Sequence, residues 1–243
     1  CNPTVSNVGA FVGSLTGTVE NCNLEDTTVT GGTTSQACGG IVGTGGRITN
    51  CNVSADCTVS GTNGIGGIVG SNSTVSGCSN AASVTSQTGS VGGIMGVVSS
   101  GTNVSVEDCV NTGTITSSTG SNVGGILGNV SLHDVTISDC INEGAVSGNT
   151  GVGGIVGRLS TNCKVSGSTS SGSVTGTSNV GGIAGTSNVK QGTQYDQGNP
   201  NTIENCTVSA KVSGTSNVGG LLGSNSVSTD ATKEATSIKN NVL

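Results

Sequence analysis

Cysteine is the residue with the most obvious chemistry in this 243-residue chain, which contains ten of them. Cysteine and histidine bind zinc when they recur in close pairs. The sequence has no Cys-x-x-Cys pair and a single histidine, so we predict no metal on the thiols. Seven cysteines recur at intervals of 23 to 43 residues, mostly after a short apolar segment: Cys22, Cys51, Cys78, Cys109, Cys140, Cys163 and Cys206.

Buried cysteine packs as a small hydrophobic side chain. We therefore predict that these seven residues stack in one column of a repeating structure, as free thiols in its core. Stacked repeats also bring neighbouring Cα atoms within the range of a disulfide, so one or two bridges are an alternative.

The other ionisable residues form no obvious catalytic set. His133 lies beside Asp134, and we interpret it as a solvated turn residue. Asp108 and Asp139 directly precede cysteines of the column, where other repeats carry Asn. Stacked Asn and Asp at a turn favour a hydrogen-bonding ladder, with a Ca²⁺ between the two Asp residues as the alternative. Because an enzyme needs a nucleophile, a general base or a metal in one place, we predict no enzymatic activity and no cofactor.

Hydroxyl side chains form a second regular pattern, because Ser and Thr flank a lone branched residue in most repeats. In a strand they point outward, about 6.7 Å apart along the chain and about 4.8 Å apart between stacked strands. A solvated β face explains them, and an ice-binding surface is the alternative, because ice-binding β-solenoids present such arrays. The candidate positions are Thr28, Thr30, Thr58, Ser60, Ser83, Thr85, Thr114, Thr116, Ser173 and Thr175.

A long polar segment, residues 186–202, contains the only tyrosine of the chain. Long loops in compact structures are usually functional or disordered, and tyrosine is enriched where proteins recognise partners. If the chain binds a host or surface protein or a glycan, we expect the contact here, through Lys190, Gln194, Tyr195 and Asp196.

One sequence phrase, Val-Gly-Gly-Ile-Val-Gly or a close variant, recurs along the chain, and the residues described above recur with the same period. Successive copies begin 30, 27, 26, 32, 29, 28 and 38 residues apart, and a period of this length indicates a solenoid or a propeller. The eight copies begin at Val8, Cys38, Ile65, Val91, Val123, Val152, Val180 and Val218.

Each repeat is interpreted as three short strands: the glycine-rich phrase, the segment before the cysteine, and the lone branched residue with its hydroxyl flanks. These segments are β-branched and are bounded by Gly, Ser and Asn, and none shows helical periodicity. We predict an all-β protein, a right-handed parallel β-helix of about eight coils of roughly 26–38 residues. Residues 1–243 form one domain, with 186–202 as an inserted loop.

The predicted core contains few residues, because only 31% of the chain is hydrophobic and aromatic residues are almost absent. Stacking allows these few residues to form a core, because each inward Val, Ile or Cys contacts the equivalent residues of the coils above and below. One question stays open. Both residues after Gly-Gly are apolar, so either a bend buries both or one of them forms an exposed apolar stripe.

Charge and hydropathy exclude some partners. Seven basic residues scattered over a chain of net charge −6 disfavour nucleic acid. No run of 18 apolar residues exists, so we predict no membrane insertion. Both ends look like interrupted coils, with Asn241 in the cysteine position of the last one, which predicts a fragment flanked by further domains.

The phrase Val-Gly-Gly-Ile-Val-Gly, followed by a strand ending in Asn-Cys and then by Gly-x-Val-Ser-Gly, resembles the GLUG-motif repeat of bacterial surface proteins. The resemblance runs from about Val8 to Gly223. Such repeats occur in large secreted or cell-wall-attached proteins, including adhesin-like proteins and the non-catalytic part of some immunoglobulin-A-cleaving metallopeptidases. The resemblance implies an extracellular β-solenoid, secreted or attached to the cell surface, that acts as a stalk or adhesive surface. It supplies no catalytic residues.

Overall fold

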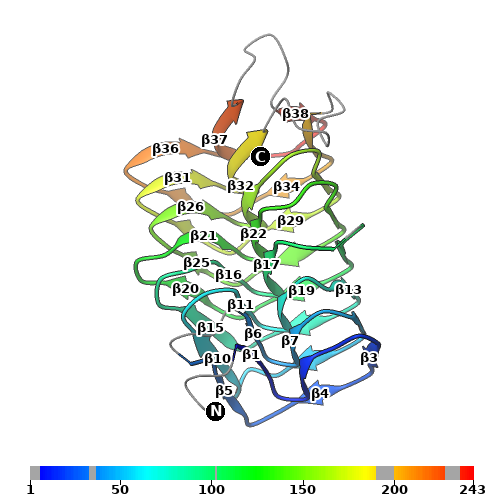
Figure 1. Ribbon diagram of the computed structural model, residues 1–243. Helices are drawn as coiled ribbons and strands as arrows, with labels where there is room; N and C mark the ends of the chain where they lie inside the picture. The colour runs from blue at the N-terminus through cyan, green and yellow to red at the C-terminus, as the bar shows by residue number, and fades with distance from the viewer. Residues whose placement is uncertain (1–5, 33–36, 102, 190–199, 228–235) are drawn as a thin grey trace.

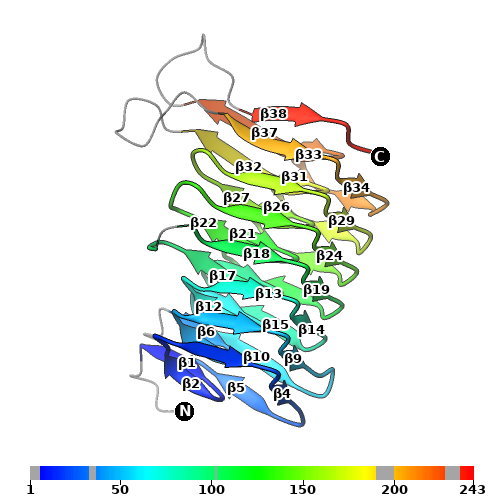
Figure 2. The ribbon, with the colours of Figure 1, turned by 90° about the vertical axis from the view of Figure 1, so that its right-hand side faces the viewer.

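The computed structural model describes the whole chain except residues 1–5, 33–36, 102, 190–199 and 228–235. The described residues form short strands and turns without helices, wound into a right-handed parallel β-helix (Figures 1 and 2). Strands from successive coils pair in parallel to form five sheets, which we label A to E in the order in which the chain visits them.

Three sheets have eight strands each. Sheet A contains β1 (Asn7–Gly9), β6 (Ala37–Gly39), β11 (Ile65–Gly66), β16 (Val91–Gly92), β21 (Ser121–Gly124), β26 (Thr150–Gly153), β31 (Ser178–Gly181) and β36 (Ser216–Gly219). Sheet B contains β2 (Val12–Ser14), β7 (Val42–Thr44), β12 (Val69–Ser71), β17 (Met95–Val98), β22 (Leu127–Val130), β27 (Val156–Leu159), β32 (Ala184–Val189) and β37 (Leu222–Val227). Sheet C contains β3 (Thr18–Glu20), β8 (Arg47–Thr49), β13 (Thr74–Ser76), β18 (Ser105–Glu107), β23 (Thr136–Ser138), β28 (Lys164–Ser166), β33 (Asn201–Glu204) and β38 (Thr236–Lys239).

The other two sheets have seven strands each. Sheet D contains β4 (Asn23–Leu24), β9 (Asn52–Val53), β14 (Ser79–Asn80), β19 (Val110–Asn111), β24 (Ile141–Asn142), β29 (Thr169–Ser170) and β34 (Thr207–Val208). Sheet E contains β5 (Thr28–Thr30), β10 (Thr58–Gly61), β15 (Ser83–Ser86), β20 (Ile115–Ser117), β25 (Val146–Ser147), β30 (Val174–Thr175) and β35 (Val212–Ser213).

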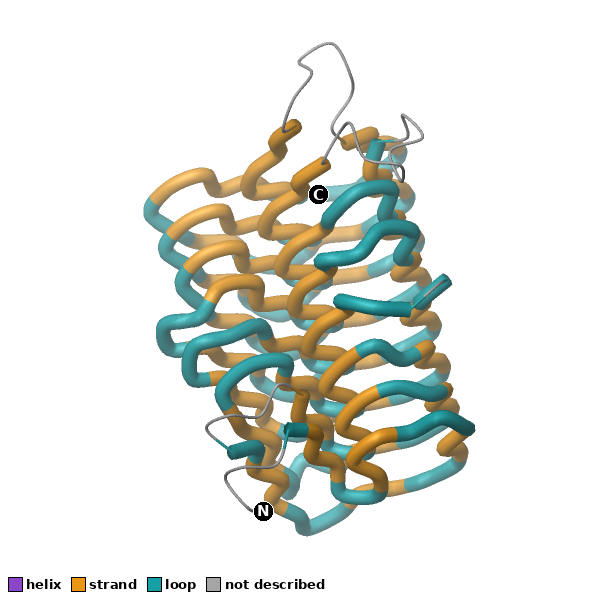
Figure 3. The backbone as a smooth tube through the Cα atoms, in the orientation of Figure 1, coloured by secondary structure: helices purple, strands orange, loops and turns teal. Residues whose placement is uncertain are grey.

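The predicted fold class is confirmed, but the coil is more finely divided than expected. Each complete coil has five short strands rather than three, and strands alternate with turns around it (Figure 3). The glycine-rich phrase bends in its middle and supplies both an A and a B strand, and the pair of residues that forms each D strand was not predicted as a strand. The described residues make seven complete sets of five strands and a partial eighth, slightly fewer than the eight coils expected.

The bend in the glycine-rich phrase answers the question left open by the sequence. Ile41 and Val42, which follow Gly-Gly in the second coil, are both fully buried. Sheets A and B approach each other so closely that a Cβ on Gly39 of sheet A would lie 2.7 Å from the amide nitrogen of Gly70 in the next B strand. A Cβ on Gly92 would meet the nitrogen of Gly128 at the same distance. The first glycine of each pair therefore lets two strands of the phrase pack backbone to backbone, and we call this contact the glycine seam.

The second glycine of each pair faces the interior at the tip of this fold. A Cβ on Gly93 would clash with the side-chain amide of Asn111 on sheet D. Asn111 belongs to a buried ladder in which Asn80 Nδ2 donates to Asn111 Oδ1 and Asn111 Nδ2 donates to Asn142 Oδ1, each at 2.8 Å. The A–B fold therefore reaches across the interior to the opposite sheet.

The predicted inward columns are otherwise confirmed, except that Val218 in the last coil is 45% exposed. Sheet A aligns the first residues of the glycine-rich phrases, as in the register Val8 to Cys38 and Cys38 to Ile65. Sheets C and E align the branched residues of the other two segments, as in Val75 to Val106 and Val59 to Val84. Most of these side chains are inaccessible to solvent, so stacking makes one continuous core.

The cysteine column needs one correction. Strand β28 is Lys164–Ser166, so the column residue of this coil is Ser168, which is fully buried, and Cys163 lies before the strand. Sequence spacing placed Cys163 in the column because it follows an Asn, but the chain enters its turn five residues later. At the far end Asn241 occupies the position as predicted, because the Cys206 amide donates to Asn241 Oδ1 at 2.8 Å.

Candidate binding surfaces

The predicted hydroxyl columns lie side by side on the outer face of sheet E. The register aligns Thr28, Thr58 and Ser83 in one column. The second column runs through Thr30, Ser60, Thr85, Thr116, Ser147 and Thr175. Thr114 and Ser173 are exposed and directly precede the inward residues Ile115 and Val174, which places them in the first column.

Hydrogen bonds between coils order part of this hydroxyl face. Thr58 Oγ1 donates to Thr28 Oγ1 at 3.2 Å, and the hydroxyls of Thr175 and Ser213 lie 3.2 Å apart. The exposed residues Ala145 and Lys211 interrupt the first column. The second column contains only hydroxyl side chains and is the more regular of the two.

The structure does not test the predicted recognition loop, because its residues lie outside the described part of the chain. These residues are Lys190, Gln194, Tyr195 and Asp196. The ends of the predicted insertion are described. Residues 186–189 continue strand β32 and residues 201–202 begin strand β33, so the segment between these strands is shorter than the sequence indicated.

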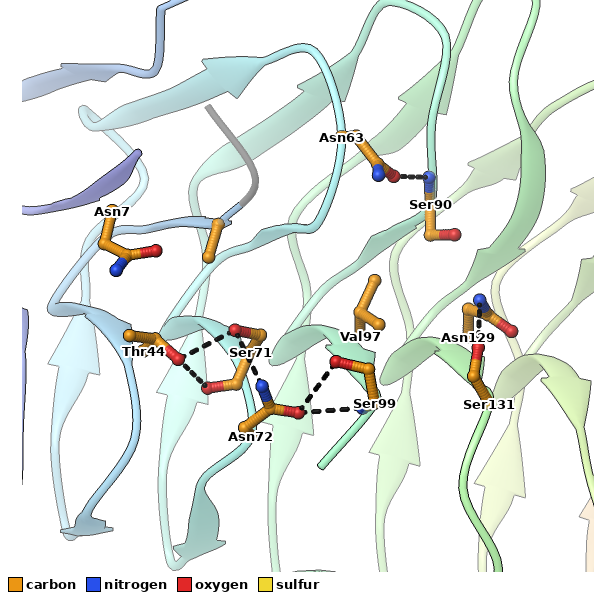
Figure 4. A pocket seen from close by; sticks show the side chains of 11 residues that line it. Asn7, Thr44, Asn63, Ser71, Asn72, Ser90, Val97, Ser99, Asn129 and Ser131 are labelled. Atoms are coloured by element: carbon orange, nitrogen blue, oxygen red, sulfur yellow. Dashed lines mark hydrogen bonds between the residues drawn. The ribbon is translucent and has the colours of Figure 1, made fainter. Parts of the chain in front are cut away.

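A third surface, which the sequence did not predict, is a polar groove where the outer ends of sheets A and B diverge from the glycine seam (Figure 4). Its volume is about 380 Å³, and its walls carry almost only amide and hydroxyl side chains. The lining residues are Asn7, Ala37, Thr44, Asn63, Ser71, Asn72, Ser90, Val97, Ser99, Asn129 and Ser131.

Hydrogen bonds within the protein hold several of these side chains in place. Asn72 Oδ1 accepts from the backbone amide of Ser99 at 2.7 Å, and Asn63 Oδ1 accepts from that of Ser90 at 2.9 Å. The Thr44 and Ser71 hydroxyls lie 2.9 Å apart (Figure 4). The groove is therefore a preorganised polar surface. The only sequence signal for it is the run of Asn, Ser and Thr on both sides of each glycine-rich phrase, which resembles ordinary turn composition.

The nine described cysteines are free, and all of them except the half-buried Cys22 are buried. Each sulfur of the column closes a turn, as where Cys51 Sγ donates to the Thr49 carbonyl at 3.3 Å. Cys78 Sγ in turn accepts from the Cys51 amide of the preceding coil at 3.3 Å. Burial raises the pKa of Cys38 and of Cys51 to about 11. A hydrogen bond with Cys109 and then burial raise the pKa of Cys78. Thiols with raised pKa values, such as those of Cys38, Cys51 and Cys78, are protonated at neutral pH and therefore weakly reactive.

The histidine and the two Asp residues singled out in the sequence lie in turns between strands. His133 Nδ1 and Asp134 Oδ2 lie 2.6 Å apart in a turn, and the His133 side chain is only 24% exposed, which is less than expected for a solvated residue. Asp108 and Asp139 are exposed and adopt positive φ angles of 52° and 54° at the turn between sheets C and D. Asn21, Asn50 and Asn205 adopt the same conformation, which Asn and Asp tolerate better than most residues.

This conformation explains the Asn and Asp pattern without a bound cation. Gly167, not Asn162, occupies the position in the coil of β28. Across the described part of the chain, no group of three or more His, Cys, Asp or Glu side chains could hold a metal ion. Nor does that part contain a helix long and apolar enough to cross a bilayer.

The fold and these surfaces define a repeat β-solenoid built on a glycine-rich phrase. Residues 148–175 match the GLUG motif, and this match spans one complete coil from β26 to β30. The resemblance stated from the sequence is therefore confirmed for that coil. No curated protein matches the chain in sequence.

Among solved structures, the chain is similar to a Bacteroides ovatus protein provisionally described as an immunoglobulin A1 protease. The TM-score is 0.56 and the sequence identity 21%, over 93% of this chain and 66% of the other. This likeness shows a shared fold. The chain spans slightly less than two thirds of that protein.

Proposed function

We propose that this chain is a non-catalytic repeat module of an extracellular bacterial protein, where it acts as a stiff spacer or adhesive stalk. The carrying observation is the uninterrupted core, in which the seven complete coils are paired in five sheets and the partial eighth coil in three. Such a stack grows in one direction only, and eight coils at about 4.8 Å per coil give a rod of roughly 35–40 Å. The GLUG match in one coil supports the same role.

The thiols are compatible with an oxidising location. Cysteines in secreted proteins usually form disulfides, yet nine are free here. Because burial raises the pKa of thiols such as Cys38, little thiolate is available to react with oxidants. Free cysteines can therefore persist in this rod outside the cell.

The location is tested on cells that make the whole parent protein. An antibody raised against the purified chain should label intact bacteria, and brief protease treatment of those cells should remove the signal. Labelling that requires cell lysis would contradict an extracellular role. Incubation of the purified chain with immunoglobulin A1 should leave the antibody intact, whereas cleavage would overturn the non-catalytic assignment.

Adhesion is tested separately from spacing. The purified chain should bind immobilised host or surface proteins or glycans if it is an adhesive module, and Tyr195→Ala tests the loop that the sequence favoured. Binding to none of these ligands, with surface labelling retained, would leave the spacer role.

An ice-binding surface is the second candidate, and the second hydroxyl column of sheet E is the observation that favours it. Its six aligned positions from Thr30 to Thr175 all carry Ser or Thr. The measurement is thermal hysteresis, with Thr85→Tyr as the variant that disrupts the column. A chain that neither depresses the freezing point nor shapes ice crystals has no such function.

A further inference from the structure

The column of outward residues on sheet B contains three consecutive polar side chains with buried, unpaired atoms. The register aligns Asn129 with Arg158 and Arg158 with Thr186. Among the described residues, Asn129 Oδ1, Arg158 Nε and Thr186 Oγ1 are buried and have no hydrogen-bond partner. Buried polar atoms are nearly always paired in folded proteins, so three neighbouring exceptions point to a missing partner.

One of these atoms belongs to the polar groove, and the other two follow it in the same column, beyond the residues that line the groove. Asn129 lines the groove, where its Nδ2 donates to Ser131 Oγ at 3.0 Å, which leaves its Oδ1 as the acceptor (Figure 4). Arg158 and Thr186 follow in the next two coils, at the strand spacing of about 4.8 Å. Thr186 is only 9% exposed, so its hydroxyl is held in a largely enclosed position. The row offers an acceptor, a donor and a hydroxyl that does both.

We infer that this groove binds a neutral oligosaccharide that lies along the rod axis. Sugar hydroxyls both donate and accept, as this row of alternating groups requires. The volume of about 380 Å³ falls in the usual range of small-ligand sites. This site is independent of the spacer role proposed above.

The composition of the groove excludes other ligand classes. Its lining residues carry no charge, and Arg158 is the one cation of the row, which is too little for an anionic polymer. Ala37 and Val97 are the apolar lining residues, too few to hold a lipid chain.

The test uses the full chain and four probes: maltotetraose, cellotetraose, chitotetraose and mannotetraose. Saturation-transfer NMR should detect contact with at least one probe, and calorimetry should give its affinity. Thr186→Val preserves the shape of the side chain and removes one unpaired hydroxyl, and Asn129→Ala removes the acceptor. Each variant should weaken binding at least tenfold. Thr85→Val on sheet E is the matched control and should bind as the unmodified chain does.

Three results of the binding measurements would overturn the inference. They are no saturation transfer with any probe, unchanged affinity in both groove variants, and equal loss of affinity in the Thr85→Val control. A crystal grown with a probe that shows ordered water only at Asn129 Oδ1 and Arg158 Nε would also overturn it. Neither groove variant removes a hydrogen bond from a buried atom, so both should melt within a few degrees of the unmodified chain. Thermal melting of the two variants therefore separates a loss of binding from a loss of folding.

Discussion

At the scale of single residues, the cysteine column shows that one position can be occupied by different side chains with the same hydrogen bonds. The Cys51 amide donates to Cys78 Sγ at 3.3 Å, and the Cys140 amide donates to Ser168 Oγ at 3.2 Å. The Cys206 amide donates to Asn241 Oδ1. The position therefore requires an acceptor for a backbone amide of the preceding coil, and cysteine satisfies this need while adding apolar volume.

Substitution of Ser168 separates these two contributions. Ser168→Cys restores the residue of the other coils and should change the free energy of unfolding by less than about 1 kcal/mol. Ser168→Val removes the partner of the Cys140 amide and should cost about 1–3 kcal/mol, because a buried donor is left unpaired. Urea denaturation of both variants measures the difference. Equal stability of the two would show that the hydrogen bond contributes nothing.

The raised thiol pKa values predict sensitivity to alkali. Burial raises the pKa of Cys38 and of Cys163 from 9.0 to about 11. As pH rises, the unfolded chain loses these protons first, so the stabilisation is complete below about pH 9 and is lost as pH approaches 11. Urea midpoints between pH 7 and 11 check this. Cys38→Val, which places the common residue of that column, should reduce the slope, and a midpoint constant to pH 11 would contradict the prediction.

At the scale of elements, the glycine-rich phrase is a folded pair of strands rather than one strand. Its first glycine belongs to the seam between sheets A and B, and its second makes room for the side chains of sheet D. The phrase is repeated because each coil needs both close approaches. The sequence indicated that these glycines mark a bend or a close contact, but the identity of the facing strand depends on how the coils stack.

Two glycine-to-alanine variants test the seam. A Cβ on Gly92 would clash with the Met95 carbonyl and lie 2.7 Å from the Gly128 nitrogen, whereas a Cβ on Gly17 would have no atom within 4 Å. Gly92→Ala should therefore destabilise the chain by at least about 1–3 kcal/mol. Gly17→Ala should be neutral or slightly stabilising, because alanine restricts the unfolded chain. Thermal melting compares them, and similar melting temperatures would contradict the seam.

At the scale of the whole molecule, the repeat period was sufficient to predict the parallel β-helix and most inward columns. Columns such as Val59 and Val84 could be assigned because every coil repeats the same spacing. Cys163 was misplaced because a local insertion changed that spacing, and spacing was the only guide. The groove could not be predicted, since Asn63 and Asn129 are far apart in sequence and meet only where sheets A and B diverge.

A stack of coils should also be most stable in its middle. Each internal coil pairs with two neighbours, whereas the first and last described coils pair with one. Hydrogen exchange should therefore be slowest in strands such as β18, β20 and β22, and faster in β1 to β5 and β34 to β38. Exchange by mass spectrometry measures this profile, and uniform protection along the rod would instead show that all coils unfold together.

The A–B fold has a mechanical consequence for the rod. Because its tip meets sheet D at contacts such as Gly93 with Asn111, the fold forms a wall of backbone that crosses the interior of the rod. A tube with such a wall resists flattening and twisting better than a single hollow tube of the same perimeter. The chain has almost no aromatic side chains that could fill a wide interior. The backbone of the A–B fold occupies this space instead and supports the surrounding sheets from inside.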